Sequence, residues 1–140
     1  MELGGQAAIQ ELAQRHGLLA VYLFGSRADD GLRLLAGETV RPEGSDLDVG
    51  VFFPRAAVDF RVLNRLQVDL EDLFEPLRVD LVPLDRVDGL FQHRAIEGHR
   101  IAAPDSTAAD FNELTVLRRA EDLLPIQREI ERQRFGWSST

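Results

Sequence analysis

The chain has 140 residues and a formal net charge of −8, with 24 acidic against 16 basic residues. This length predicts a single domain, 1–140, and the acidic balance argues against extensive binding of nucleic-acid phosphates, although one bound nucleotide remains compatible with it. Every basic residue is arginine, which excludes a Walker-type P-loop and a Schiff-base lysine, and the lack of cysteine excludes disulfides and thiolate sites.

The chain also lacks signals for membranes and export. No apolar run approaches the roughly 20 residues that a membrane span needs. Residues 1–17 have neither the basic nor the apolar region of a signal peptide. We therefore expect no membrane association and a cytoplasmic location.

The first half of the chain is predicted to contain one helix and two strands. Apolar residues at helical spacing predict a helix over 6–16, and the continuous apolar run 18–24 predicts a strand. A second strand is expected over 46–53. Between the strands, 29–44 contains three glycines, one proline and mixed charges, which predicts a loop with a short strand or helical turn within 31–35.

The second half is predicted to be mostly helical. Apolar residues recur every three or four positions from Phe60 to Leu77, with Asp59 placed as the cap, and this is the strongest helix prediction in the chain. The remaining elements expected are a short strand at 79–82, a helix over 88–98, an extended segment at 100–103 and helix over 106–135 with a kink or break at Pro125.

These elements predict an α/β (α+β) fold, in which helices pack on a small mixed β-sheet. The catalytic core is expected over 1–103, and 104–140 is expected to form a C-terminal helical segment.

Three aspartates stand out on the predicted strands. Asp46 and Asp48 are two residues apart, so in a strand they share a face with Cα atoms about 6.5–7 Å apart. Asp80 is a lone acid within the apolar run 79–82. If the two strands are neighbours, three carboxylates converge. Such a set suits Mg²⁺, and two ions held this way favour in-line displacement at phosphorus.

Gly25-Ser26-Arg27 follows the first predicted strand and offers groups for a phosphate. Glycine lets a ligand approach the backbone, and Ser26 provides a hydroxyl together with free N–H groups if a helix begins there. Arg27 is expected to add a charged donor.

This pattern resembles the polymerase-β-type nucleotidyltransferase superfamily. The segments FGSR, GSDLDVGV and VDLV, in a chain this short, are similar to the minimal nucleotidyltransferases, the MNT family of MntA-type antitoxins paired with HEPN-domain toxins. The segment FQHRAIEGHRIA, 91–102, also resembles that family. The likeness extends over about 18–103.

The resemblance implies roles for particular residues. Asp46 and Asp48 would bind metal, and Asp80 would be the third carboxylate and the base for the acceptor hydroxyl. The triphosphate of ATP would be held by Gly25, Ser26, Arg27 and Ser45. Two Mg²⁺ ions would assist transfer of AMP from ATP to a hydroxyl, expected to be a tyrosine, of a partner HEPN-type toxin.

One departure from the family concerns the link between Ser26 and Asp46. Its nineteen residues are about twice the family's usual length, with the surplus around 32–41. Loop insertions cost little stability, so the consequence falls on access to the nucleotide and on the choice of partner.

Other interpretations stay open at this point. The chain is alternatively a non-catalytic antitoxin that neutralises its partner by occlusion, or a small-molecule nucleotidyltransferase with an aminoglycoside-like acceptor. A DxD glycosyltransferase is disfavoured because its fold needs a longer chain. His93 and His99 are predicted to lie on the surface rather than in a metal site, and the tail 135–140 is assigned to either the core or a partner. The oligomeric state, including a homo-oligomer, is left open.

Overall fold

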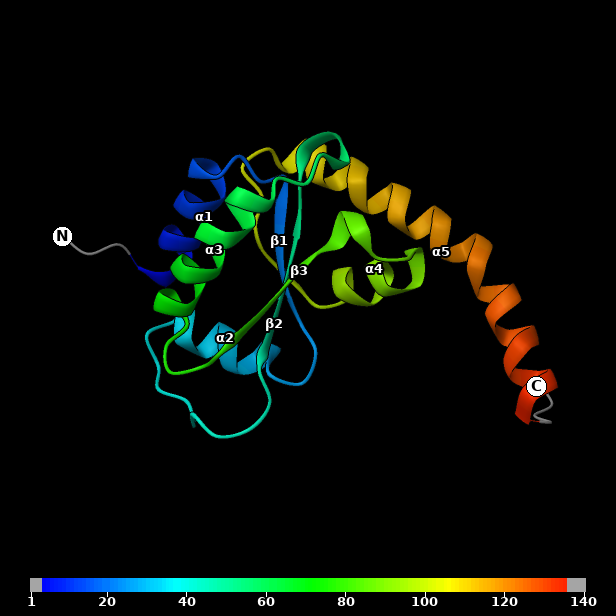
Figure 1. The fold of residues 1–140 in the computed structure, drawn as a ribbon, viewed down its shortest axis with the longest axis horizontal. Helices are drawn as coiled ribbons and strands as arrows, with labels where there is room; N and C mark the ends of the chain where they lie inside the picture. The colour runs from blue at the N-terminus through cyan, green and yellow to red at the C-terminus, as the bar shows by residue number, and fades with distance from the viewer. Residues whose placement is uncertain (1–3, 136–140) are drawn as a thin grey trace.

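The computed structural model describes residues 4–135 and consists of one sheet between two layers of helices. The strands are β1 (Ala20–Phe24), β2 (Leu47–Phe52), β3 (Val79–Pro83) and β4 (His99–Ala102), and the helices are α1 (Gly5–Arg15), α2 (Ala28–Leu35), α3 (Phe60–Leu73), α4 (Gly89–Ile96) and α5 (Ser106–Phe135). Short 3-10 turns cover Pro54–Ala56 and Leu84–Arg86. Figure 1 shows the chain, with α5 extending away from the sheet.

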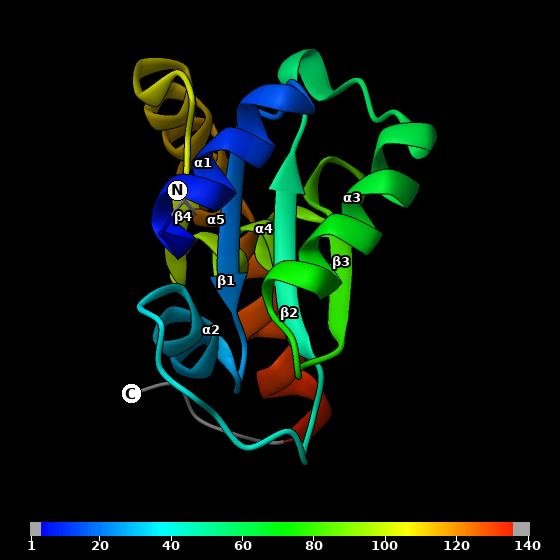
Figure 2. The same cartoon turned by 90° about the vertical axis from the view of Figure 1, so that its left-hand side faces the viewer.

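The four strands pair in the order β3-β2-β1-β4. β1 is antiparallel to both β2 and β4, whereas β2 and β3 are parallel and are joined by the crossover helix α3. The carboxyl end of β1 therefore lies at the same edge of the sheet as the amino ends of β2 and β3, which is the lower end of the sheet in Figure 2. The mixed sheet predicted from the sequence is confirmed.

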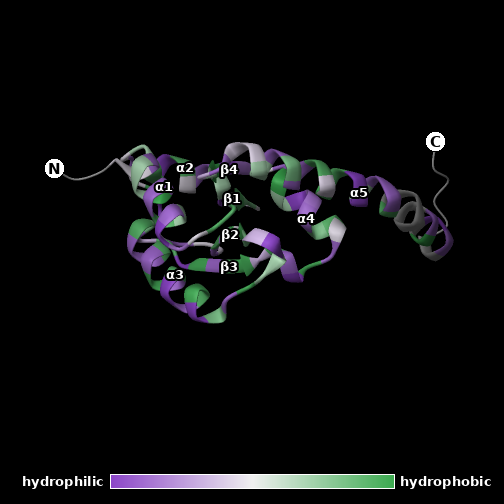
Figure 3. Cartoon of the chain, turned by 90° about the horizontal axis from the view of Figure 1, so that it is seen from above, coloured by the Kyte–Doolittle hydropathy of each residue, from purple (hydrophilic) through white to green (hydrophobic). Residues whose placement is uncertain are grey.

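Both faces of the sheet are covered. Successive side chains of β1 point to opposite faces, so Leu23 packs in one cluster with α1 and α3, and Tyr22 packs in a second cluster with α4 and α5. Figure 3 shows α1 and α3 on one side of the strands and α4 and α5 on the other. All five residues of β1 are buried, which explains its uninterrupted apolar sequence.

The predicted loop 29–44 begins inside a helix, α2, which is longer than the short strand or helical turn predicted within 31–35. The prediction of a loop was therefore wrong for its first part, and the helical alternative was the correct one. α2 buries Ala28, Gly31 and Leu35, which recur at helical spacing. It ends at Leu35. Gly37, two residues later, has a φ of 85°, and the amides of Gly37 and Glu38 donate to the carbonyls of Leu34 and Arg33, respectively. This is the usual C-terminal cap of a helix. Acidic residues in the first turn also favour helix rather than loop.

The other predicted elements are present with small shifts at their ends. β1 begins two residues later than expected, β2 begins at Leu47, and β4 begins one residue before the predicted extended segment. β3 ends on Pro83, which is tolerated because β3 is an edge strand.

The C-terminal segment is one helix of 30 residues that continues through Pro125. Of the two alternatives predicted there, a kink or a break, the break into two helices is therefore wrong. The end of the tail, 136–140, lies outside the described residues. Within residues 4–135, no helix is both long enough and apolar enough to cross a membrane.

The side chain of Asp59 caps the first turn of α3. Asp59 Oδ1 accepts hydrogen bonds from the amides of Arg61 (2.9 Å) and Val62 (3.3 Å). We expect Asp59→Ala to lower the free energy of unfolding by about 1 kcal/mol. Chemical denaturation measures this change. Asp72→Ala, an exposed change in the same helix, is the control, and an equal loss in both variants would contradict the capping role.

Candidate active site

The three aspartates meet at the edge of the sheet where β2 and β3 begin. Asp48 and Asp80 are direct partners in the parallel register, so their side chains share a face. Asp46 lies just before β2. Asp46 and Asp80 are exposed, and Asp48 is half-buried.

Burial and neighbouring acids together raise the pKa of Asp48. Burial is the largest cause, followed by the negative charge of Asp80, a hydrogen bond shared with Asp80, and the charge of Asp46. Among the described residues, no cationic side chain contributes to lowering this pKa. The edge therefore holds like charges that repel, a condition that a bound cation would relieve.

Gly25 brings the turn after β1 against these acids. Its φ is 76°, and a Cβ at this position would overlap the Oδ2 atom of Asp48. Phe24, the residue before it, is the antiparallel partner of Asp48. Glycine is therefore required both by the backbone conformation and by the close approach of the Asp48 carboxylate.

The two predicted phosphate-binding serines lie together. The hydroxyls of Ser26 and Ser45 are hydrogen-bonded at 3.0 Å, although the residues are 19 positions apart. Both are exposed, and α2 begins two residues after Ser26. The turn after β1 and the residues before β2 thus form one exposed polar edge.

The structure gives Arg27 a different setting from the one expected. Its side chain is only 9% exposed, and its Nε donates to Asp30 at 2.8 Å. The remaining bonds go to backbone carbonyls of the loop before β2, at Arg41 (2.5 Å), Glu43 (3.0 Å) and Ser45 (3.2 Å). Arg27 thus holds the loop in place, and these bonds occupy most of the donors expected to face a phosphate.

The acids do not form a compact metal cage. In the part of the chain that the structure describes, no group of three or more His, Cys, Asp or Glu side chains is arranged to hold a metal ion. Asp48 and Asp80 are aligned on neighbouring strands, and the charge of Asp46 also acts on Asp48.

The sequence did not predict that residues of α4 and β4 lie beside the Gly25-Ser26 turn. A pocket of about 290 Å³ is lined by Gly25 and Ser26 on one side and by Arg94, Glu97 and His99 on the other. His99 is exposed, as predicted, but it is next to the turn because β4 pairs with β1 and aligns His99 with Leu23. No local sequence signal reveals that pairing.

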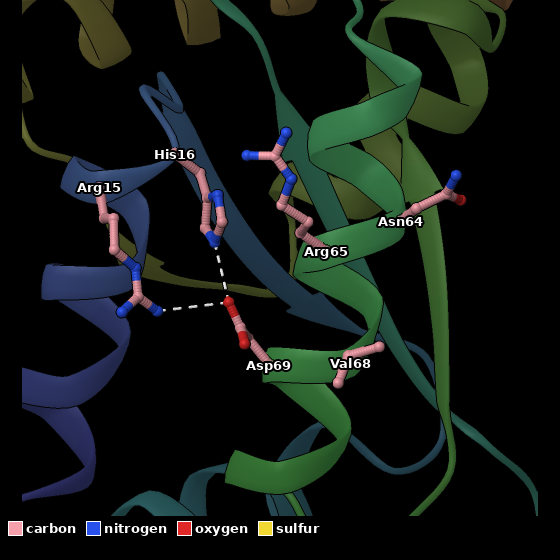
Figure 4. Close-up of a pocket in the computed structure, with 6 residues that line it drawn as sticks. All are labelled: Arg15, His16, Asn64, Arg65, Val68 and Asp69. Carbon is pink, nitrogen blue, oxygen red and sulfur yellow. Dashed lines mark hydrogen bonds and ion pairs between the residues drawn. The ribbon is translucent and has the colours of Figure 1, made fainter.

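A larger depression lies elsewhere, between the end of α1 and α3. It has a volume of about 620 Å³ and is shown in Figure 4. Asp69 accepts hydrogen bonds from His16 Nε2 (2.9 Å) and Arg15 (3.3 Å), which tie the two helices together. None of the predicted site residues lines it, so we assign it a structural role.

The fold, together with the acidic edge formed by Asp46, Asp48 and Asp80, is that of a known protein family. The family described as polymerase beta, nucleotidyltransferase matches residues 7–107, which is more than half of the chain. The chain therefore belongs to the polymerase-β nucleotidyltransferase family. No curated protein matches it.

Several solved structures are similar to the chain. A mutant of the toxin–antitoxin MntA-HpeT has a TM-score of 0.64 and 17% identity, covering 89% of this chain and 93% of that one. A toxin–antitoxin with AMP-PNP has a TM-score of 0.62 and 20% identity, covering 89% and 94%. The structure of a tri-AMPylated Shewanella oneidensis HEPN toxin in complex with MNT antitoxin has a TM-score of 0.61 and 16% identity, covering 90% of this chain and 92% of that one. At these identities, the likeness is one of fold.

Replacement of Arg27 tests its role in holding the loop. We expect Arg27→Ala to lower the free energy of unfolding by roughly 3 kcal/mol, because several bonds to a buried charged group are lost. Amide hydrogen exchange over 41–46 should also accelerate. Arg33→Ala is the control, since Arg33 binds the same Asp30 at 2.8 Å but is exposed. Unchanged exchange over 41–46 in Arg27→Ala would contradict this role.

The raised pKa of Asp48 predicts a pH-dependent effect of Asp48→Asn. Because the folded state holds the proton more tightly than the unfolded state, ionisation of Asp48 destabilises the fold as the pH rises. Without added metal, Asp48→Asn should therefore be more stable than the wild type at about pH 7. The gain should be only a few tenths of a kcal/mol, because solvent screens the charge of this half-exposed group.

The same measurement at low pH provides the check. The gain should vanish near pH 3, where the carboxyl group is protonated in both states. Asp122→Asn, an exposed change on α5, should show no such pH dependence. A gain that is independent of pH would mean that relief of charge is not the cause.

Proposed function

We propose that this protein is a Mg²⁺-dependent nucleotidyltransferase that transfers AMP from ATP to a hydroxyl group of a partner toxin, and so acts as an antitoxin in the cytoplasm. The observation that carries the proposal is the alignment of Asp48 with Asp80 beside the Gly25-Ser26 turn. Membership of the polymerase-β nucleotidyltransferase family supports the same reaction class.

The donor set at this edge fits a divalent cation. Carboxylate oxygens are the ligands that Mg²⁺ prefers, and the pKa of Asp48 is raised first by burial and then by the negative charges of Asp80 and Asp46. Asp48 and Asp80 would hold the ion, with Asp46 completing the set and contributing to a second ion. When bound, the metal supplies neutralisation of charge on the phosphoryl group and a lower pKa for the attacking hydroxyl.

The residues around the acids position the nucleotide. The backbone of Gly25 would allow close approach of the phosphates. Ser26 and Ser45 are hydrogen-bonded to each other, so one of the two hydroxyls donates to the other and the second would donate to a phosphate oxygen. Arg27 acts indirectly, since its bonds to the loop hold Ser45 against Ser26. Positioning of this kind is a major part of catalysis in phosphoryl transfer.

Asp80 is placed to act on the acceptor. It is exposed at the edge, where an incoming hydroxyl can reach it. Asp80 takes the proton as the hydroxyl oxygen bonds to the α-phosphorus, and the bond from that phosphorus to the β-phosphate oxygen breaks, releasing pyrophosphate.

The acceptor is proposed to be a tyrosine hydroxyl on a HEPN-type toxin. A similar solved structure contains a tri-AMPylated HEPN toxin in complex with MNT antitoxin, and another contains AMP-PNP. Both likenesses support this choice of acceptor and of an adenine nucleotide.

One observation favours a second candidate, neutralisation of the partner by occlusion without turnover. The link between Ser26 and Asp46 is nineteen residues long, about twice the usual length in the family, and this affects access of the nucleotide to the acids. In this case the protein would bind and inhibit its partner but would not modify it.

A labelling experiment separates the two candidates. Incubation of the protein with α-labelled ATP, Mg²⁺ and a cognate HEPN-type toxin should transfer the label to the toxin. Asp48→Ala and Asp80→Asn should each lower the rate by about 100-fold or more, because the charge of the phosphoryl group is no longer offset. An exposed acid far from the edge, Asp122, provides the control, and Asp122→Asn should retain the wild-type rate.

The outcomes are distinct. Transfer that depends on Asp48 and Asp80 supports the enzyme. An unlabelled but inhibited toxin supports occlusion, and it would end the proposal of AMP transfer to this acceptor.

A further inference from the structure

The pocket beside Ser26 carries an arginine and a histidine to which the proposed chemistry has given no role. Gly25 and Ser26 form one wall, and Arg94, Glu97 and His99, from the end of α4 and the start of β4, form the other. None of the three aspartates lines it. The turn after β1 thus has the acids on one side, next to Gly25, and the pocket that contains Arg94 on the other.

The closeness of the two walls depends on Gly98. A Cβ at position 98 would overlap the carbonyl oxygen of Leu23 and would lie 3.0 Å from the Cβ of Phe24. Any larger residue would push the turn between α4 and β4 away from the end of β1. The ring of Phe91 on α4 also packs edge-on against Phe24, with centroids 5.8 Å apart. The wall that carries Arg94 is therefore held at a short, defined distance from Ser26.

The ion pairs of the pocket leave Arg94 available. Glu97 is paired with His93 at 3.3 Å, and Asp29 is paired with His99 Nε2 at 3.5 Å. Among the described residues, Arg94 forms no ion pair, and its side chain is exposed. Asp29 is 81% exposed, so it can turn into solvent and release His99 to another anion.

We propose that Arg94 and His99 bind the terminal phosphates of the nucleoside triphosphate, an inference that rests on the proposed function. The triphosphate would lie across Gly25 and Ser26, with its α-phosphate towards the aspartates and its tail in the pocket. The chain has no lysine, and Arg27 is engaged by the loop, so the guanidinium of Arg94 is the natural partner of this charge, and a ring N–H of His99 can donate beside it. A guanidinium binds phosphate oxygens through two parallel hydrogen bonds.

This assignment makes a prediction about nucleotide preference. Arg94 would contact groups that ATP has and AMP lacks. The variant Arg94→Ala should therefore weaken binding of ATP by about 10-fold or more and leave the dissociation constant of AMP within about twofold, in line with the energy of a charge-assisted hydrogen bond. His99→Gln should act in the same direction with a smaller effect.

Isothermal titration of the full chain with ATP and, separately, with AMP, both in the presence of Mg²⁺, measures these constants. Arg61→Ala, an exposed arginine at the start of α3, is the matched control and should bind both nucleotides as the wild type does. Circular dichroism checks that Arg94→Ala keeps its fold, which we expect because the side chain is exposed.

The results separate this inference from the function on which it rests. Loss of ATP affinity alone in Arg94→Ala supports it. Wild-type binding of ATP with an unchanged ratio of ATP to AMP affinity in Arg94→Ala would overturn the role of Arg94 and leave the proposed function standing. If the wild type binds no ATP at all, both fail.

Discussion

The parallel pairing of β2 with β3 is the constraint on which the acidic edge depends. This register sets Asp48 directly beside Asp80. Because side chains alternate along a strand, a shift by one residue would turn Asp80 to the opposite face of the sheet. The crossover helix α3 maintains the register by burying Leu66 and Leu70 against one face. The site is therefore built on two strands whose register is fixed by packing against α3.

The same arrangement has an energetic cost that the rest of the fold must offset. Asp48 has a raised pKa because it is partly buried beside other acids. The stability comes from elsewhere, mainly from the apolar side chains buried on both faces of the sheet. Raised pKa values with these causes, burial and neighbouring like charges, tend to cluster at functional sites.

Arg27 connects the acidic edge with the long link that precedes it. The link from Ser26 to Asp46 consists of α2 followed by an extended loop, and Arg27 fastens that loop through three backbone carbonyls. Ser45 consequently meets Ser26 despite their separation along the chain. The additional residues of the link are thus folded into the structure, and in a chain without lysine an arginine has taken a supporting role.

The sequence by itself determined the kinds and the order of most elements, because apolar periodicity reports which face of a segment is buried. This holds for α1, α3, α4 and the three strands that the continuous apolar runs mark. It also identified the aspartates, the glycine–serine turn and the likeness to nucleotidyltransferases. These are local patterns, readable without knowledge of what each segment touches.

Only the tertiary structure decided the contacts between distant segments. It turned part of the expected loop into α2, whose burial against the sheet outweighs the glycine in its middle. It engaged Arg27 with a loop up to 18 residues away, and it placed Arg94 and His99 beside Ser26 through the pairing of β4 with β1. Strand order and close packing between residues far apart in the chain set these positions, and no single segment encodes them.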